Sequence, residues 1–319
     1  MTQKEIAKSM NISVRTVSRV LNGDPSVKEA TRRRVIMTLN RNGCYIQTHT
    51  HTENVVFDVS SGLFHRSQAL ALMQELSNKG FNFLVTNHQQ DWKLFRERIM
   101  EADIVVFCSC PTHEVIVETR EINPDILRIN LFSNGVPGAE ISIEPDNNVG
   151  GKLAAQHLYS FGHRDVLVLL LESSCAIMER AKSFIAEIML LHPKCHVEWQ
   201  FFHAAGNLEQ DIADFFRKKS SLPTAVFCPT GYLSCLTVRA LNTLGIRIPD
   251  DISLLGFDLP EDVSLPFPQR VDTVYFRPSH IISLAEYYIV NRFILKEKCQ
   301  VRVSSHVERM INGSVKKLK

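Results

Sequence analysis

Apolar and polar residues recur with a helical period over the first 43 residues of the chain. Within residues 13–23, Val17, Val20 and Leu21 follow one another at spacings of three and four, which places them on one side of a helix. The polar residues of this stretch fall on the opposite side. The pattern predicts three short helices before Gly43, the second with one apolar and one polar face.

Capping signals mark the starts of these helices. Thr2 and Glu5 form a Thr-x-x-Glu capping box, so the first helix is expected to begin near Thr2. Asn11 lies in the following turn, where it tolerates a left-handed backbone better than most residues. Ser13 can cap the second helix with its hydroxyl group, and a third helix is expected to start within Ser26–Glu29. A capped helix, a turn and a second capped helix in this order predict a helix-turn-helix unit.

The polar face of the second helix suits the major groove of DNA, because it combines guanidinium, amide, hydroxyl and small apolar groups without a carboxylate. Arg15 and Arg19 can donate forked hydrogen bonds to guanine, and Val14 can contact a thymine methyl group. Ser13 and Thr16 lie beside a helix amino end, which suits a phosphate. The alternative is an amphipathic bundle that binds a protein. The expected DNA-contacting residues of this helix are Ser13, Val14, Arg15, Thr16, Ser18, Arg19 and Asn22.

Positive charge is concentrated in the same region. Residues 1–47 contain nine Lys or Arg and three acidic residues, a net charge of +6, whereas the whole chain carries +2 and residues 48–319 therefore −4. A basic head on a mildly acidic body indicates a polyanionic partner for the head alone. The run Arg32-Arg33-Arg34 is expected to face phosphates, which set the register of a protein on DNA without reading its sequence. For Arg33 and Arg34, a solvated surface is the alternative.

Composition narrows the remaining possibilities. The chain has 319 residues, 45% of them apolar, enough for a large core in two or three units. It has no apolar run long enough to span a membrane and no secretory signal at its start, so a cytoplasmic protein is expected. Its eight scattered cysteines are expected to be reduced thiols. Cys108-Ser109-Cys110 has no partner pair nearby in sequence, so neither a metal site nor a cofactor is predicted.

Beyond residue 54, short apolar runs alternate with helical patterns, which is typical of parallel sheets covered on both faces. So many strands exceed one ordinary sheet. An α/β body of two doubly wound subdomains is therefore predicted behind the all-α head, with a break near Ser142–Asp146 and ligands bound outside the carboxyl ends of the strands. The predicted strands are Val55–Val59, Phe81–Thr86, Asp103–Cys108, Ile126–Leu131, Val166–Leu171, Val197–Phe202, Thr224–Cys228 and Ile252–Phe257.

Short motifs along the chain resemble those of one family, the lactose-repressor/galactose-repressor family of bacterial transcription regulators. Family members join a helix-turn-helix head to a body like the periplasmic sugar-binding proteins. The matching blocks follow the family order over nearly the whole chain. They are Thr16-Val17-Ser18-Arg19-Val20-Leu21-Asn22, Thr31-Arg32, Asp146-Asn147, His157-Leu158, Gly162-His163-Arg164, Arg180 with Ser183-Phe184, Ile248-Pro249-Asp250-Asp251-Ile252-Ser253 and Gly256-Phe257-Asp258.

The resemblance implies a homodimer that binds a two-fold operator, usually represses transcription and responds to a small metabolite, most often a sugar or sugar derivative. It adds Thr31 and Arg32 to the expected DNA-contacting residues. The expected units are the head (1–46), a short linker (47–54) and a body (55–319) for effector binding and dimerisation, divided into one subdomain of 55–144 plus 276–297 and another of 145–275 plus 298–312.

The same resemblance implies a ligand site in the body. Asp146, Arg180 and Asp258 match positions where family members hold ligand hydroxyl or carboxylate groups. Carboxylate acceptors beside a planar guanidinium suit a polyhydroxylated molecule, and ion pairs with a purely structural role are the alternative. The expected ligand-binding residues are Ser61, Phe64, Asp146, Arg180, Thr230 and Asp258.

Three departures from the family pattern modify these expectations. The linker Ile46–Asn54 has no leucine to insert into the minor groove as a wedge. Pro229-Thr230-Gly231 stands where the family commonly has Asn-Asp, and Ser60–Phe64 is shorter than usual. A family member that regulates without an effector is therefore the alternative.

An enzyme is not expected. The chain has no Gly-x-Ser-x-Gly elbow and no Gly-x-Gly-x-x-Gly turn, and the segment before Lys152 fails the phosphate-loop pattern because residue 146 is Asp.

Overall fold

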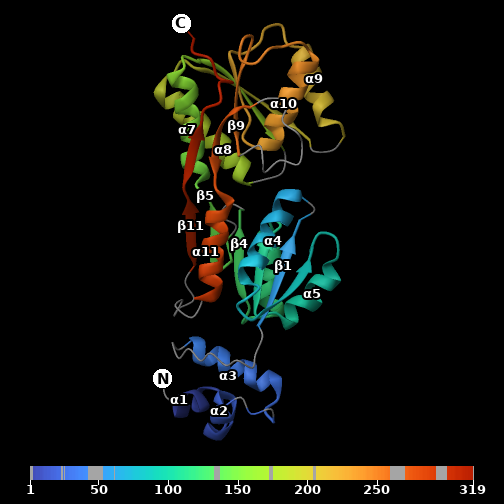
Figure 1. Cartoon of the computed structure of the whole chain (residues 1–319), viewed down its shortest axis with the longest axis vertical. Coiled ribbons are helices and arrows are strands. Elements are labelled where there is room, and N and C mark those ends of the chain that lie inside the picture. Colours follow the sequence, from blue (N-terminus) through green and yellow to red (C-terminus); the bar gives the residue numbers. More distant parts are fainter. Residues whose placement is uncertain are drawn as a thin grey trace.

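The structure is a computed structural model in which three units follow one another along the long axis of the molecule (Figure 1). A small helical head is followed by two α/β subdomains, as the sequence pattern predicts. The expected linker falls almost entirely outside the described residues. The structure describes residues 3–22, 24, 26–41, 53–60, 62–132, 137–171, 175–203, 206–258, 270–291 and 300–318.

The head contains the three predicted helices, α1 (Gln3–Ser9), α2 (Val14–Leu21) and α3 (Glu29–Arg41). Its core is formed by apolar residues from each helix, including Ile6, Val17 and Val35, which are fully buried. Asn11 has a left-handed backbone with φ of 53°, and Ser13 caps α2 by accepting a hydrogen bond from the N–H of Thr16 at 3.0 Å. The helix-turn-helix prediction is confirmed.

The first subdomain is a six-stranded, wholly parallel sheet in the order β11-β5-β4-β3-β1-β2. Helices α4 and α11 pack together on one side, and α5 contacts α6 and the first two strands. Its elements are β1 (Glu53–Val59), α4 (Leu63–Leu76), β2 (Phe81–Thr86), α5 (Trp92–Glu101), β3 (Ile104–Cys108), α6 (His113–Ile122), β4 (Leu127–Leu131), β5 (Ile141–Pro145), α11 (Pro278–Val290) and β11 (Val301–Ser305).

The second subdomain has a six-stranded sheet in the order β12-β10-β9-β8-β6-β7, parallel except for the antiparallel strand β12. Helices α7 and α8 pack against each other, and so do α9 and α10. Its elements are α7 (Asn147–Ser160), β6 (Asp165–Leu171), α8 (Cys175–Leu191), β7 (His196–Phe202), α9 (Leu208–Arg217), β8 (Ala225–Phe227), α10 (Gly231–Thr243), β9 (Ser253–Phe257), β10 (Asp272–Phe276) and β12 (Val307–Met310).

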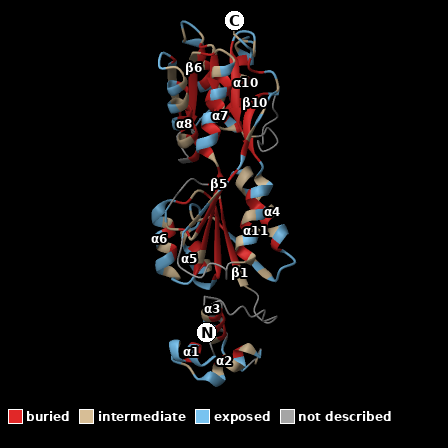
Figure 2. Cartoon of the chain, turned by 90° about the vertical axis from the view of Figure 1, so that its left-hand side faces the viewer, coloured by how far each residue is buried: buried red, intermediate tan, exposed pale blue. Residues whose placement is uncertain are grey.

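The central strands of both sheets are buried on both faces (Figure 2). All residues of β3 and β9 are buried, for example, whereas the edge strand β7 alternates between exposed and covered residues. Continuous apolar runs mark strands that are covered by helices on both sides. All eight strands predicted from such runs are present, each within two residues of its expected ends.

The division of the body between subdomains needs one correction. Residues 298–312 were assigned to the second subdomain, but β11 pairs in parallel with β5 and therefore belongs to the first sheet. The chain then crosses at His306 and enters the second sheet as β12, which pairs with β10. The reason is that Val301–Ser305 forms the outer edge of the first sheet, which a pattern along the chain does not reveal.

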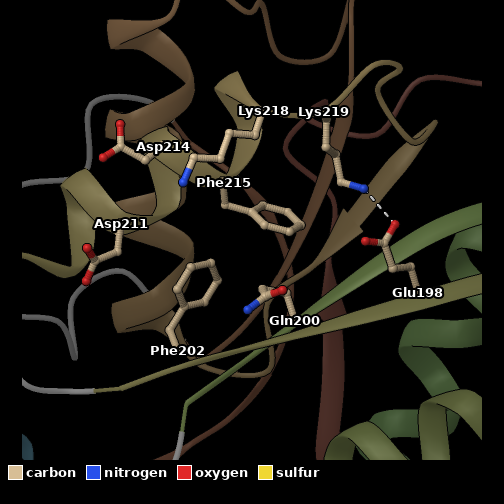
Figure 3. Close-up of a pocket in the computed structure, with 8 residues that line it drawn as sticks. All are labelled: Glu198, Gln200, Phe202, Asp211, Asp214, Phe215, Lys218 and Lys219. Atoms are coloured by element: carbon tan, nitrogen blue, oxygen red, sulfur yellow. Dashed lines mark hydrogen bonds and ion pairs between the residues drawn. The ribbon is translucent and has the colours of Figure 1, made fainter.

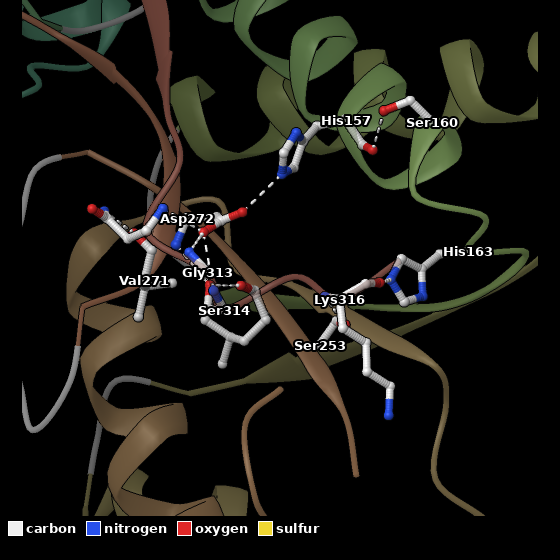
Figure 4. Close-up of polar contacts among 11 residues, drawn as sticks. His157, Ser160, His163, Ser253, Val271, Asp272, Gly313, Ser314 and Lys316 are labelled. Carbon is white, nitrogen blue, oxygen red and sulfur yellow. Dashed lines mark hydrogen bonds and ion pairs between the residues drawn. The ribbon is translucent and has the colours of Figure 1, made fainter. Parts of the chain in front are cut away.

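The carboxyl-terminal segment is tied to the second sheet (Figure 4). The backbone N–H groups of Asn312, Gly313 and Ser314 all donate to Oδ1 of Asp272, at 2.7, 2.6 and 3.0 Å. On the other side of this carboxylate, Nε2 of His157 lies 3.0 Å from Oδ2. One buried carboxylate thus joins helix α7, strand β10 and the end of the chain.

Candidate functional site

The polar face of α2 is open to solvent. Arg15, Arg19 and Asn22 are exposed, and Val14 is 40% exposed at the start of the helix. Thr16 and Ser18 are half-buried. On the opposite face, Val17 and Val20 are fully buried in the head and Leu21 is partly buried. The structure thus brings the predicted residues of this helix together on one accessible surface. It carries cationic and hydroxyl groups and no carboxylate of its own.

Arg19 contacts a carboxylate that follows the helix. Its Nε lies 3.4 Å from Oδ2 of Asp24, and the N–H of Ser26 donates to Oδ1 at 2.9 Å. Hydrogen bonds from the Ser26 side chain and backbone, with smaller contributions from the cations Arg19 and Arg32, lower the pKa of Asp24. Asp24 is a residue of this surface that no pattern in the sequence marks.

Arg32 departs from the expectation of an exposed, phosphate-facing run. It is 5% exposed, and its Nη2 donates a hydrogen bond to the backbone carbonyl of Asp24. The guanidinium points inward because this hydrogen bond links α3 to Asp24, which follows α2. Arg34 is exposed as expected and Thr31 is half-buried, whereas the side chain of Arg33 lies outside the described residues.

In the body, backbone strain collects where strands end. Among the described residues of the body, three non-glycine residues have a left-handed backbone within two residues of the ends of β3, β4 and β9. They are Cys110 with φ of 54°, Phe132 with 65° and Asp258 with 75°. Such conformations cost free energy for residues with a side chain and cluster at functional sites. These positions lie at the carboxyl ends of parallel strands, where ligands of doubly wound folds bind.

Arg180 is the centre of a buried polar group in the second subdomain. Its Nε donates to Oδ1 of Asn147 at 2.8 Å, and its Nη1 donates to the Pro229 carbonyl at 2.9 Å and to Oδ2 of Asp258 at 3.2 Å. The guanidinium carbon lies 3.7 Å from the centre of the Phe257 ring. Burial lowers the pKa of Arg180, and the charge of Asp258 opposes this shift.

Two polar atoms of this group point to a missing partner. Among the described residues, Nδ2 of Asn147 and Oδ1 of Asp258 are buried and accept or donate no hydrogen bond. Burying an amide donor and a carboxylate acceptor without partners is costly. One donor and one acceptor beside a guanidinium match the hydroxyl groups of a polar ligand.

Two predicted ligand residues also serve as helix caps. Oδ1 of Asp146 accepts from the N–H of Val149 at 2.9 Å at the start of α7, and Oγ1 of Thr230 accepts from the N–H of Leu233 at 3.1 Å at the start of α10. Asp146 is the residue predicted for the ligand site, whereas its neighbour Asn147 is the one that contacts Arg180. An Asp directly before a helix is itself a capping signal that favours this arrangement.

Phe64 lies in an aromatic cluster that joins the subdomains. Its ring centre is 5.1 Å from that of Phe132 in the first subdomain and 6.3 Å from that of Phe276 at the end of β10. Both contacts are edge-to-face, a favourable arrangement for aromatic pairs. Ser61, another predicted ligand residue, lies outside the described residues.

A second polar cluster, missed from sequence, lies at the carboxyl ends of β1 and β3. Asp58 is fully buried, accepts from the backbone N–H of His88 at 2.8 Å and from the hydroxyl of Ser109, and lies 2.6 Å from the His88 ring. Nearby, Nδ1 of His65 lies 2.8 Å from the hydroxyl of Ser60, and burial lowers the pKa of His65. The sequence contains one signal for this cluster, because Asp58 is a polar residue within an otherwise apolar run of β1.

A surface hollow of about 460 Å³ lies elsewhere, between β7 and α9 (Figure 3). Phe202 and Phe215 form its apolar part, and an ion pair between Lys219 and Glu198 at 2.6 Å closes one side. No residue of the Arg180 group lines it. It is therefore separate from the site predicted by the sequence.

The described residues contain no group of three or more His, Cys, Asp or Glu side chains arranged to hold a metal ion. In the same described part of the chain, every helix is too short or too polar to cross a membrane.

Comparisons with known proteins agree with this architecture. Residues 2–42 match the family described as bacterial regulatory proteins, lacI family. Residues 155–269 match the periplasmic binding protein-like domain.

Curated relatives cover most or all of the chain. The transcriptional repressor PurR of Vibrio vulnificus is 25% identical, with 99% of each chain covered. The transcriptional regulator DegA of Bacillus subtilis is 24% identical over 80% of each chain, and catabolite control protein A of Priestia megaterium is 23% identical over 92% of each. DegA and PurR are named as a transcriptional regulator and a transcriptional repressor.

Solved structures share the fold over nearly the full length. The lac repressor dimer bound to operator and the anti-inducer ONPF has a TM-score of 0.68 at 17% identity and covers 99% of both chains. A complex of the transcriptional regulator CelR with cellobiose has a TM-score of 0.66 at 21% identity, with 98% of this chain and 99% of that chain covered. The chain thus combines a head that matches the lacI family with a periplasmic-binding-protein-like body, and it is similar over its length to transcription regulators with these parts.

Proposed function

We propose that this regulator binds a two-fold DNA operator as a homodimer and represses transcription there, under the control of a polyhydroxylated metabolite. The observation that carries the proposal is the exposed polar face of α2, with Arg15, Arg19 and Asn22 on one accessible surface. A capped helix with such a face fits the major groove, where guanidinium groups read guanine. The lac repressor, a structural neighbour, was solved as a dimer on its operator.

Replacing Arg19 by alanine tests this assignment. Arg19→Ala should reduce affinity for a footprinted operator by about tenfold or more, because a good bidentate contact to a base is worth ~1–3 kcal/mol. Fluorescence anisotropy with operator and unrelated DNA measures the effect. Arg217→Ala is the matched control, since it removes an exposed arginine from the second subdomain.

In the control, operator affinity should be unchanged. Equal operator affinity of the wild type and Arg19→Ala would contradict a reading role for α2. Failure of the wild type to prefer any promoter fragment over unrelated DNA would overturn the proposal as a whole.

The Arg180 group supports a polar effector. Its unpaired amide donor and carboxylate acceptor lie beside a guanidinium and an aromatic face, a combination that recognises hydroxyl-rich molecules. CelR was solved with cellobiose, and a lacI-family regulator of Enterococcus faecium with ribose. We therefore place the effector at Asn147, Arg180 and Asp258, with Asp146, Thr230, Phe64 and Ser61 as its expected surroundings.

A second candidate is a regulator that has lost its effector. The observation in its favour is that Arg180 already donates to Asn147, Pro229 and Asp258, so its charge is compensated internally. The two candidates differ in one measurable property, since only an effector-binding body is stabilised by a metabolite.

A further inference from the structure

We propose that Asp24 is a positioning residue that orients Arg19 for base recognition and raises the preference of the head for its operator over other DNA. The inference rests on the proposed function, because it assumes that α2 reads DNA. The starting observation is that Asp24 lies just beyond the C-terminal end of α2, and its carboxylate contacts Nε of Arg19 at 3.4 Å.

Asp24 is fixed at both its backbone and its side chain. Its N–H donates to the Arg19 carbonyl at 3.0 Å, and its carbonyl accepts from the N–H of Val27 at 3.2 Å and from the buried guanidinium of Arg32. The N–H of Ser26 holds Oδ1 at 2.9 Å. Oδ2 lies toward Arg19, so the contacts of Ser26 and Arg19 together set the orientation of the carboxylate.

This arrangement determines how Arg19 is presented. A carboxylate on Nε restricts the long side chain and leaves the two terminal nitrogens, Nη1 and Nη2, as the forked donor that guanine requires. Arg19 is still 46% exposed at its side chain, so the fork remains accessible. Ordering the side chain before binding removes part of the entropy cost that an unrestrained arginine would incur on DNA.

The charge of Asp24 has a second effect. Hydrogen bonds from Ser26 lower the pKa of Asp24, so the carboxylate is charged at neutral pH. A negative charge beside the reading face repels the phosphate backbone of any DNA. At an operator, the oriented Arg19 compensates for this repulsion through its base contacts, whereas on other DNA nothing does. Asp24 therefore favours specific over non-specific binding.

The burial of Arg32 fits the same arrangement. Its guanidinium binds the Asp24 carbonyl from inside the head, which holds the connection between α2 and α3 in place. Arg32 thus acts on DNA recognition through Asp24 and Arg19, not through a phosphate.

A double-mutant cycle tests the proposal on the full-length protein. The variants are Asp24→Asn, Arg19→Ala and the pair together, and affinities are measured by anisotropy on a footprinted operator and on unrelated DNA of equal length. Asn preserves an oxygen that can accept from Ser26 but removes the charge. Asp24→Asn should weaken operator binding about tenfold in the wild-type background. In the Arg19→Ala background, it should leave operator affinity unchanged or raise it, because only the repulsive charge is then removed.

On unrelated DNA, Asp24→Asn should leave affinity unchanged or raise it, because a repulsive charge is gone. A purely structural role for Asp24 predicts instead an equal loss with and without Arg19, on both DNAs, and that result would overturn the inference. So would an unchanged operator affinity in Asp24→Asn. If the wild type and Arg19→Ala already bind the operator equally, the proposed function itself fails, and the two failures are thereby distinguished.

Discussion

At the scale of single residues, three arginines show how surroundings assign different roles to one side chain. Arg19 is exposed and forms an ion pair with Asp24 through Nε. Arg32 is buried and bonded to a backbone carbonyl, and Arg180 is buried with a carboxylate and an amide as partners. An arginine is buried at acceptable cost only when its donors find acceptors. The number of acceptors around each arginine therefore differs between Arg19, the proposed reader of DNA, Arg32, which links two parts of the head, and Arg180, the proposed ligand residue.

His163 provides a residue-scale test of stability. It is fully buried, with Nδ1 3.0 Å from the hydroxyl of Thr224 and Nε2 3.1 Å from the Lys316 carbonyl. Burial lowers the pKa of His163 to about 4 from an ordinary 6.5. Between these values the unfolded chain binds more protons than the folded one, so stability is full above pH 6.5 and falls as the pH drops toward 4.

The expected loss for the wild type between pH 7.5 and 5.5 is about 1.4 kcal/mol from this residue. His163→Gln removes the titrating group and should lose that much less over the same interval. Urea unfolding at the two pH values measures the difference. The same pH dependence in both proteins would show that His163 does not titrate as described.

At the scale of elements, helix starts and helix packing organise the body. Helices α7 and α10 begin directly after strands, and Asp146 and Thr230 cap them. A cap that follows a parallel strand necessarily lies at the carboxyl edge of the sheet, beside the ligand region of such folds. This is why residues that resemble ligand contacts also have a structural role here.

The α7–α8 packing depends on a glycine. A Cβ at Gly151 would lie 2.3 Å from the Arg180 carbonyl and 2.9 Å from the Phe184 nitrogen, both backbone atoms of α8. Gly151→Ala should therefore push α8 away and destabilise the fold by about 1–3 kcal/mol. It should also disturb Arg180, which lies on the same helix.

Thermal unfolding measures this prediction, with Gly62→Ala as the control. A Cβ at Gly62 would meet only side-chain atoms, at 3.4 and 3.6 Å, which is ordinary contact. If Gly151→Ala is as stable as the control, the two helices are not as tightly packed as the structure indicates.

At the scale of the whole molecule, the two subdomains are joined by three crossings of the chain. The chain leaves the first sheet after β5, returns to it through α11, and leaves again at His306 between β11 and β12. Phe64, Phe132 and Phe276 pack together across the subdomains. The proposed ligand at the strand ends would therefore act on the relative position of two units that share several connections.

Effector binding is testable as stabilisation of the whole body. At a concentration of about one hundred times its Kd, a ligand adds roughly 2.7 kcal/mol to stability. A thermal-shift screen of sugars, sugar phosphates and nucleosides should give at least one clear rise in Tm. Asp258→Asn should lose that rise, because it removes a carboxylate acceptor of the Arg180 group.

Asp214→Asn is the control, because Asp214 lies on α9 in an exposed ion pair. It should retain the ligand-induced rise in Tm. No rise with any compound in the wild type would support the regulator without an effector.

The sequence by itself determined the helical head, the exposed face of α2, eight strands and the alternating order of the body. Each of these depends on residues close together in the chain: a capping Ser13, a left-handed Asn11, and apolar runs with a period of two or 3.6. Local periodicity is a direct consequence of which face an element buries, so it can be seen without the fold.

Only the tertiary structure decided which distant residues meet. Asp24 with Arg32, Asn147 with Arg180, and β11 beside β5 are separated by between 8 and about 160 positions. Such pairings arise from how packed layers bring chain segments together, and no short-range pattern encodes them. The same physical fact explains why Arg32 is buried and not exposed as predicted. A run of arginines in the sequence does not reveal which of them finds a buried acceptor and turns inward.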